Sequence, residues 1–205
     1  MRAEGLRRRQ WLGAVSVLGV AGVGPVLRSV GMAGLLPGAA GLAGAPRTSH
    51  AAAAADASPG FVHRRWPSGR PTPPIDLPTW EGGPWRLAEA RGQVVVANFW
   101  ASWCEPCRAE LPSLELLAER HAKDKLQVVA VNYRETDGAI RRFLAQAPLS
   151  LPILRDSDGG VARAYQIRIF PTTVVFGRDG RAAFTVTGEV DWTGAAARPW
   201  LASVL

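Results

Sequence analysis

The sequence predicts an α/β domain, with a central mixed sheet flanked by helices, that follows an N-terminal leader. Three observations support this prediction. Short β-branched apolar runs alternate with segments of helical periodicity, the two cysteines lie where one such run meets a helix, and a stretch rich in Pro and Gly separates both features from an apolar N-terminus. A chain of 205 residues has room for one ordinary domain and a processing segment.

Residues 1–57 have the layout of an export signal. Arg8 and Arg9 precede a Gly- and Ala-rich apolar segment, and this arrangement resembles a bacterial twin-arginine signal. Arg7 departs from that pattern, which usually has Ser or Thr at this place. We therefore expect the domain to lie in the periplasm or on the extracytoplasmic face of the cell membrane.

The end of the leader has two interpretations. Small-x-small patterns end at Ala45 and at Ala57, and we expect cleavage after Ala57 because Pro46 would follow a cut at the first. The alternative is an uncleaved anchor, since residues 11–27 are seventeen apolar or small residues, at the lower edge of a membrane span.

Positive charge is concentrated in the leader. Residues 1–57 hold six Arg and two acidic residues, whereas the remainder holds 18 Lys or Arg and 15 acidic residues. The later part shows no basic stripe with interleaved aromatic residues, so the sequence gives no support for nucleic-acid binding. Residues 58–78 are rich in Pro, Gly, Ser and Arg, which predicts a flexible tether, and the domain is expected to cover residues 79–205.

The first strand and helix of the domain are predicted from opposite periodicities. Residues 93–100 are short, β-branched and nearly free of charge, as expected for a strand buried on both faces. Leu111, Leu114 and Leu117 then recur at helical spacing, which predicts a helix over residues 104–123.

The later elements repeat this alternation. A hairpin turn is expected at residues 178–180, where Asp and Gly stand between two apolar runs. The remaining elements are predicted as strands at 126–133, 172–176 and 182–187, a short extended piece at 151–154, and helices at 137–146, 160–165 and 193–205.

The cysteine pair predicts a thiol-disulfide redox site. Cys104 opens the predicted helix, where the partial positive charge of the helix N-terminus lowers the pKa of a thiol and favours the thiolate. We expect Cys104 to attack a partner disulfide and Cys107, one turn deeper, to resolve the mixed disulfide. Pro106 suits the first turn because its missing N–H would be unpaired there.

Other uses of two cysteines are a metal site, a structural disulfide or two unrelated buried thiols. A zinc site of this type needs four ligands, and the only histidines are His50, His63 and His121. Outside the cytoplasm disulfides are the resting state, so a chain whose only cysteines form a vicinal pair does not use them as a scaffold. We expect neither a metal nor a cofactor.

The chain resembles the TlpA/ResA-like thioredoxins, which are exported thiol-disulfide reductases. The resemblance covers residues 75–205 and depends on Pro112 and on three segments: "NFWASWCEPC", "VVAVNYRET" and "IFPTTVVFGRDGR". It implies a thioredoxin-like fold and a cis peptide bond before Pro171, beside the disulfide. The backbone of Phe170 would then be available for pairing with a substrate segment. Trp103, like the family tryptophan before the first cysteine, would contact substrate, pack over the helix start, or both.

The acidic group of the site differs from that of cytoplasmic thioredoxins. These bury an acid on the first central strand, where this chain has Asn98, and an amide cannot accept a proton. Glu110, three residues after Cys107 and on the same side of the helix, is the candidate replacement. The resemblance implies a functional role for it. The alternative is a solvated helix carboxylate, and at a surface position substitution by Gln would leave folding almost intact.

The direction of electron transfer follows from the residues between the cysteines. Glu105 opposes a thiolate on Cys104, which favours a reductant, and with Pro106 it is expected to touch substrate. The resemblance implies a membrane thiol-electron carrier as donor, and as acceptor the haem-attachment cysteines of apocytochrome c or the copper-site cysteines of respiratory assembly factors. The alternatives are a dithiol oxidant or isomerase, and a copper-binding or haem-delivery module that uses both thiols as ligands.

Overall fold

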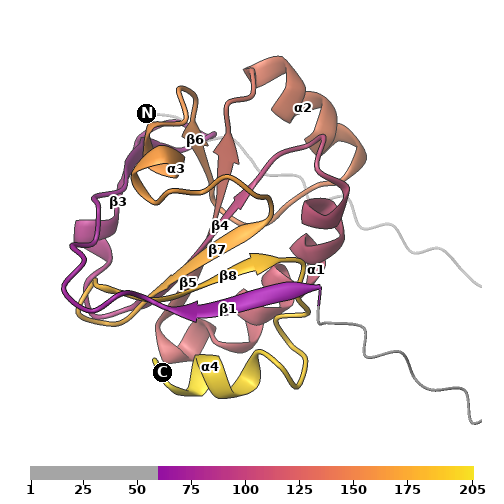
Figure 1. Cartoon of the computed structure of the whole chain (residues 1–205). Coiled ribbons are helices and arrows are strands. Elements are labelled where there is room, and N and C mark those ends of the chain that lie inside the picture. Colours follow the sequence, from indigo (N-terminus) through magenta and orange to yellow (C-terminus); the bar gives the residue numbers. More distant parts are fainter. Residues whose placement is uncertain (1–59) are drawn as a thin grey trace, which may run out of the picture. The chain divides into compact units, whose positions relative to one another are not determined.

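The computed structural model describes residues 60–205, in which six strands form a mixed sheet with helices on both faces (Figure 1). The predicted export signal and its cleavage site lie outside the described residues. The strand order is β1-β8-β7-β4-β5-β6, with β1 (Phe61–Arg65), β4 (Val94–Trp100), β5 (Leu126–Tyr133), β6 (Ile153–Asp156), β7 (Thr172–Phe176) and β8 (Ala182–Gly188). The predicted fold class is therefore confirmed.

The central strand β4 connects the parallel and antiparallel halves of the sheet. It pairs in parallel with β5 and antiparallel with β7, with Phe99 opposite both Val131 and Thr172. All seven of its residues are buried, because helices or connecting segments cover both faces of the sheet. The carboxyl end of β4 therefore lies beside the start of β7.

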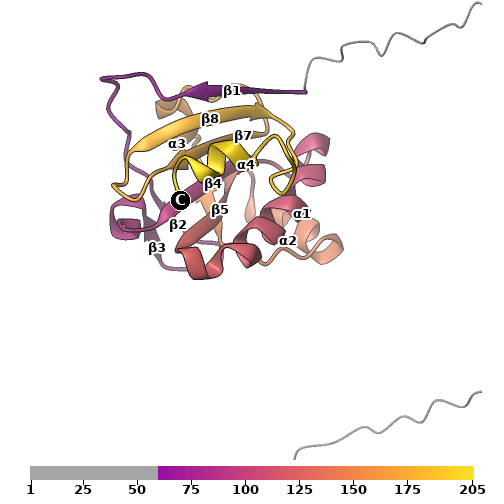
Figure 2. The same ribbon diagram turned by 90° about the horizontal axis from the view of Figure 1, so that it is seen from below.

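The helices divide between the two faces of the sheet (Figure 2). Side chains of α1 (Glu105–Arg120), α2 (Asp137–Gln146) and α4 (Arg198–Ala202) share one apolar cluster with Trp100. The other cluster contains Phe99 and Phe176 and is covered by the short helix α3 (Gly160–Ala164), the 3-10 helix η1 (Leu87–Ala90) and the hairpin of β2 (Asp76–Pro78) and β3 (Pro84–Arg86). None of the helices in residues 60–205 has the length and apolar content needed to span a bilayer.

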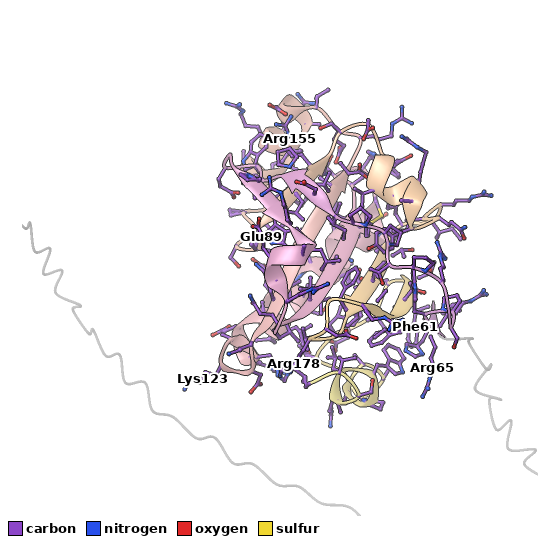
Figure 3. All side chains as sticks on the ribbon, turned by 90° about the vertical axis from the view of Figure 1, so that its left-hand side faces the viewer. Phe61, Arg65, Glu89, Lys123, Arg155 and Arg178 are labelled. Atoms are coloured by element: carbon purple, nitrogen blue, oxygen red, sulfur yellow. A yellow bond between two sulfur atoms is a disulfide. The ribbon has the colours of Figure 1, made fainter. Side chains whose placement is uncertain are left out.

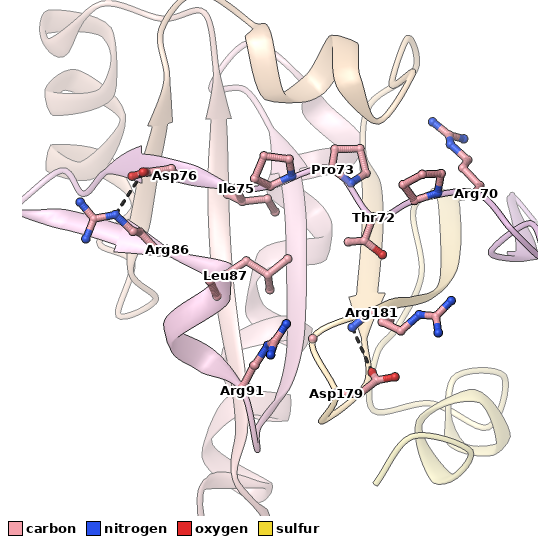
Figure 4. Close-up of a pocket in the computed structure, with 14 residues that line it drawn as sticks. Arg70, Thr72, Pro73, Ile75, Asp76, Arg86, Leu87, Arg91, Asp179 and Arg181 are labelled. Carbon is pink, nitrogen blue, oxygen red and sulfur yellow. Dashed lines mark hydrogen bonds and ion pairs between the residues drawn. The ribbon is translucent and has the colours of Figure 1, made fainter.

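The prediction of a flexible tether is wrong for residues 60–78. β1 adds an edge strand to the sheet by pairing with β8, and it packs Phe61 and His63 against Trp200 of α4. Farther along, the hydroxyl of Tyr165 donates to the carbonyl of Pro73 at 2.5 Å, and Ile75 is buried. This segment lines one side of a cavity, which η1 and the β7–β8 turn also line (Figure 4). The cavity has a volume of about 420 Å³. The domain therefore begins near Phe61, not at residue 79.

Two predicted helices end differently in the structure. The helix expected over 104–123 is α1, which ends at Arg120 and is followed by the 3-10 helix η2 (Ala122–Asp124). The helix expected over 193–205 is reduced to α4. Its first part is a turn because the Asp191 side chain accepts hydrogen bonds from the backbone N–H and the hydroxyl of Thr193.

The two ends of the described chain lie at opposite ends of the sheet. Gly188 (φ +98°) closes β8, and a Cβ there would lie 2.2 Å from the carbonyl oxygen of Gly60, so the entering chain passes directly over it. At the far end Arg178, in the predicted hairpin turn, donates to the carbonyls of Gly92, Asp124 and Leu205 (Figure 3).

Candidate redox site

A disulfide joins Cys104 and Cys107 at the start of α1, with their Cα atoms 5.3 Å apart. Cys104 is the N-cap residue, and its Sγ accepts a hydrogen bond from the backbone N–H of Cys107 at 3.3 Å. Cys104 is 5% exposed and Cys107 is fully buried. The predicted order, with Cys104 nearer to solvent, matches this burial, and both sulfurs lie at the positive end of a 16-residue helix. Pro106 occupies the first turn, as expected.

A carboxylate from the loop after β5 holds the loop before Cys104. Glu135 accepts hydrogen bonds from the backbone N–H of Ser102 at 2.7 Å and from its hydroxyl at 2.5 Å, and a third from Asn132 at 2.7 Å. This residue was missed in the sequence. A signal was present, because it closely follows β5, and the carboxyl ends of parallel neighbours meet at one edge of a sheet.

Aromatic side chains form an exposed rim beside the disulfide. Trp103 is 66% exposed and meets the ring of Phe170 edge to face, with centroids 6.1 Å apart. Phe170 also packs against Tyr133 at 4.7 Å, and the adjacent Ile169 is 62% exposed. The structure thus brings together the predicted pair Trp103 and Phe170 and adds two residues to it. Glu105, also predicted here, is exposed in the first turn of α1.

The Phe170–Pro171 peptide bond is cis, as predicted. The carbonyl of Pro171 accepts from the backbone N–H of Gly188 at 2.9 Å, and Thr172 pairs with Phe99 of β4, so this loop lies at the edge of the sheet that carries Cys104. The backbone N–H and C=O of Phe170 make no hydrogen bond within residues 60–205. They are free to pair with an incoming chain.

Glu110 is buried behind the disulfide. Its carboxylate, 2% exposed, accepts hydrogen bonds from Trp192 Nε1 at 2.7 Å and from Asn98 Nδ2 at 2.9 Å. Loss of hydration outweighs these two hydrogen bonds and raises the pKa of Glu110 to about 7. The alternative of a solvated carboxylate is wrong, because Glu110 lies on the face of α1 that packs against β4. The expectation that Glu110→Gln would leave folding almost intact assumed a surface position, and this assumption is wrong as well.

The polar side chains around Glu110 come from two strands of the sheet and a loop near the C-terminus. Asn98 of β4 also donates to Thr173 Oγ1 of β7 at 2.9 Å, and its own Oδ1 has no partner within the described residues. Alternation along the paired strands gave a signal for Thr173, since it stands opposite Asn98. No sequence signal indicated Trp192, because it reaches the site from a loop far away in the sequence. Residues 60–205 contain no group of three His, Cys, Asp or Glu side chains arranged to hold a metal ion.

Comparisons with known proteins extend this description. The family model described as AhpC/TSA matches residues 68–184. The chain is 38% identical to thioredoxin-like protein YneN of Bacillus subtilis over 115 residues, 55% of this chain and 66% of that protein. It is 32% identical to thiol-disulfide oxidoreductase ResA of Geobacillus thermodenitrificans over 122 residues, 60% of this chain and 70% of the relative. The matched stretch thus spans about two thirds of these relatives.

Two solved structures have a fold similar to that of this chain. The structure named for thiol:disulfide interchange protein DsbE of Chlorobium tepidum superposes with a TM-score of 0.61 at 30% identity, covering 66% of this chain and 96% of that one. StoA of Bacillus subtilis superposes with a TM-score of 0.52 at 27% identity, covering 60% and 97%.

Proposed function

Because the chain belongs to the AhpC/TSA family and is a thioredoxin-like thiol-disulfide oxidoreductase with a Cys104–Cys107 pair, we propose that it is an exported reductase of protein disulfides. The observation that carries this proposal is the disulfide at the start of α1, which lies between a partly exposed rim and a buried carboxyl group. The exposed part of the rim supports contact with a partner protein, and the buried carboxyl group supports proton transfer during exchange.

The reaction exchanges one disulfide for another without a cofactor. The Cys104 thiolate of the reduced protein attacks one sulfur of the substrate disulfide, and the other substrate sulfur leaves as a thiolate. Cys107 then attacks the Sγ of Cys104 and releases the second substrate thiolate. Two electrons pass to the substrate, and the Cys104–Cys107 disulfide remains.

Glu110 acts in the second step, the attack by Cys107. With a pKa of about 7, its carboxyl group exchanges a proton near neutral pH, and it follows Cys107 by one turn on the buried face of α1. We assign it the removal of the Cys107 proton as that thiol becomes the attacking thiolate. Trp103, Phe170 and Pro171 are assigned the contact with the substrate chain.

The direction and the partners follow from the ring residues and the resemblance. Glu105 places a negative charge inside the ring, which disfavours the thiolate form and so favours a reductant. In an oxidising compartment the oxidised protein needs a donor, for which we propose a membrane thiol-electron carrier. Haem-attachment cysteines of apocytochrome c and copper-site cysteines remain the proposed acceptors, and the leader of residues 1–57 supports export.

The decisive measurement is the redox potential, obtained by equilibrating the protein with glutathione buffers. A reductase is expected near the value of thioredoxin, about −270 mV. A value above about −180 mV, the range of isomerases, would contradict the proposal and favour the oxidant or isomerase. Copper titration against Cys107→Ser tests the metal-binding alternative, which requires both thiols for tight binding.

A further inference from the structure

A groove rich in arginine leads away from the redox edge on the face of the sheet that carries α3. It has a volume of about 470 Å³, and its lining includes Arg64, Arg65, Arg70 and Arg168. Half-buried threonines of β8 lie among its other lining residues. We call it the arginine groove.

The groove is continuous with the loop beside the disulfide. Ile169 and Thr172, which flank the cis bond, both line it. Across the strands, Thr172 pairs with Thr187, and Thr187 pairs with Val62, two residues before Arg64. A chain that pairs with the free backbone of Phe170 therefore has the groove next to it.

The groove has one sign of charge. Four arginines line it and no Asp or Glu does, although residues after 57 as a whole carry 18 basic and 15 acidic side chains. Within residues 60–205, Arg64, Arg65 and Arg168 make no ion pair or side-chain hydrogen bond, and Arg70 stacks on Trp66 at 4.4 Å. A hollow lined by one sign of charge concentrates its field and attracts the opposite charge.

The cavity of Figure 4 is a useful contrast. It also has four arginines in its lining, but Asp76 and Asp179 stand among them, and Arg86 is paired with Asp76 at 3.1 Å. None of its residues belongs to the redox loops. Of these two cavities, only the arginine groove combines unpaired positive charge with continuity to the disulfide edge.

Protection of a sheet edge explains part of this charge. Arg64 and Arg65 lie on the edge strand β1, where charged residues prevent pairing with other chains. Arg70 and Arg168 come from two connecting segments, which have no edge to protect, and converge on the same hollow. The convergence therefore requires another reason.

We infer that the arginine groove binds an acidic segment that flanks the target cysteines of the substrate protein. This inference rests on the proposed function and names the class of disulfide that the site would reduce fastest. Pairing at Phe170 would place the target disulfide against Cys104, while carboxylates farther along the same chain meet Arg64 and Arg168.

The test uses three synthetic peptides that share one internal disulfide and differ only in a short flank of Asp, Ser or Lys, placed on either side. The reduced protein should reduce the Asp peptide about tenfold faster than the Ser peptide at low salt, and the Lys peptide slowest, because steering acts on association. The preference should disappear near 1 M salt, where charges are screened within about 3 Å.

Variants locate the effect. Arg64→Glu with Arg168→Glu should abolish or reverse the preference, and Arg168→Glu alone should weaken it without touching β1. Arg198→Glu, an exposed arginine of α4 on the other face of the sheet, should preserve it. Reduction of neutral dithiodipyridine should stay unchanged in all variants and reports an intact disulfide site.

The outcomes separate the two proposals. If the wild-type protein reduces no peptide and has an oxidising potential, the proposed function is wrong. Equal rates for all three peptides, alongside a reducing potential, overturn only the acidic-segment inference. Retention on anionic phospholipid vesicles that is lost in the double variant, with unchanged peptide preference, would also overturn it and assign the arginines to a membrane surface.

Discussion

Glu110 shows how a single side chain takes its properties from distant parts of the chain. A helix position three residues after a cysteine predicts only its side of α1, while the pKa of its carboxyl group depends on burial under Trp192 and on the amide of Asn98. The pKa of about 7 lies above the ordinary 4.5, so the folded protein holds this proton more tightly than the unfolded chain. Its stabilising effect is complete below pH 4.5 and is lost as the pH rises through about 7.

Glu110→Gln should remove this pH dependence. In the wild-type oxidised protein, the free energy of unfolding should fall by about 3 kcal/mol from Glu110 alone between pH 4.5 and 7, and in the variant this fall should be absent. Denaturant unfolding at several pH values measures it. Glu119→Gln, an exposed position of the same helix, should keep the wild-type slope. Parallel curves for wild type and Glu110→Gln would show that Glu110 titrates normally.

Trp192→Phe should raise the pKa of Glu110 above about 7, since the indole N–H stabilises the charged carboxylate. Trp100→Phe is the matched control, because this tryptophan is also fully buried but its Nε1 has no partner within the described residues. Each variant should lose stability on the order of 1–3 kcal/mol. A carboxyl titration followed by infrared spectroscopy separates them. An equal shift in both would mean that packing, not the hydrogen bond, sets this pKa.

At the scale of elements, β1 is the first strand of the domain. Its side chains alternate between the two faces of the sheet: Phe61 and His63 pack on Trp200, whereas Val62, between them, is 48% exposed. The strand has few apolar residues of its own, and its stability comes from pairing with β8 and from contact with α4.

Phe61→Ala should therefore lower the free energy of unfolding by about 1–2 kcal/mol, because it removes the ring contact with Trp200. Val62→Ala, on the opposite face of the same strand, should change it by less than about 0.5 kcal/mol. Thermal or denaturant unfolding compares the two. If residues 60–66 were a tether in solution, both substitutions would be silent.

The predictable elements carry their signals locally. The apolar runs of β4 and β5, the ends of α2 and the turn at Gly180 follow from nearby residues, as does the position of Cys104. The cis bond before Pro171 followed only from the family resemblance. β1 was missed because its charged and Pro-rich surroundings are typical of a linker. The contacts that hold it lie more than a hundred residues away, and the one that brings Trp192 to the site spans 82 residues. Periodicity carries no information on such contacts.

At the scale of the whole molecule, the redox state and the stability of the fold are linked. Whatever disfavours the thiolate form makes the oxidised protein the more stable one, and Glu105 acts in this direction. We expect the denaturant midpoint to be higher for the oxidised protein than for the protein kept in a phosphine reductant. A higher midpoint for the reduced protein is the behaviour of an oxidant and would contradict the proposed direction of transfer.

The crossing of Gly60 over Gly188 places the N-terminal end of the described chain at the redox edge of the domain. The chain enters at the redox edge, one strand away from Pro171, whereas Leu205 lies at the opposite end, held by Arg178. A surface or label joined directly to Gly60 is thus brought up to the redox edge, and one joined after Leu205 leaves that edge open. For immobilised assays the C-terminal attachment is the one that presents the disulfide to large substrates.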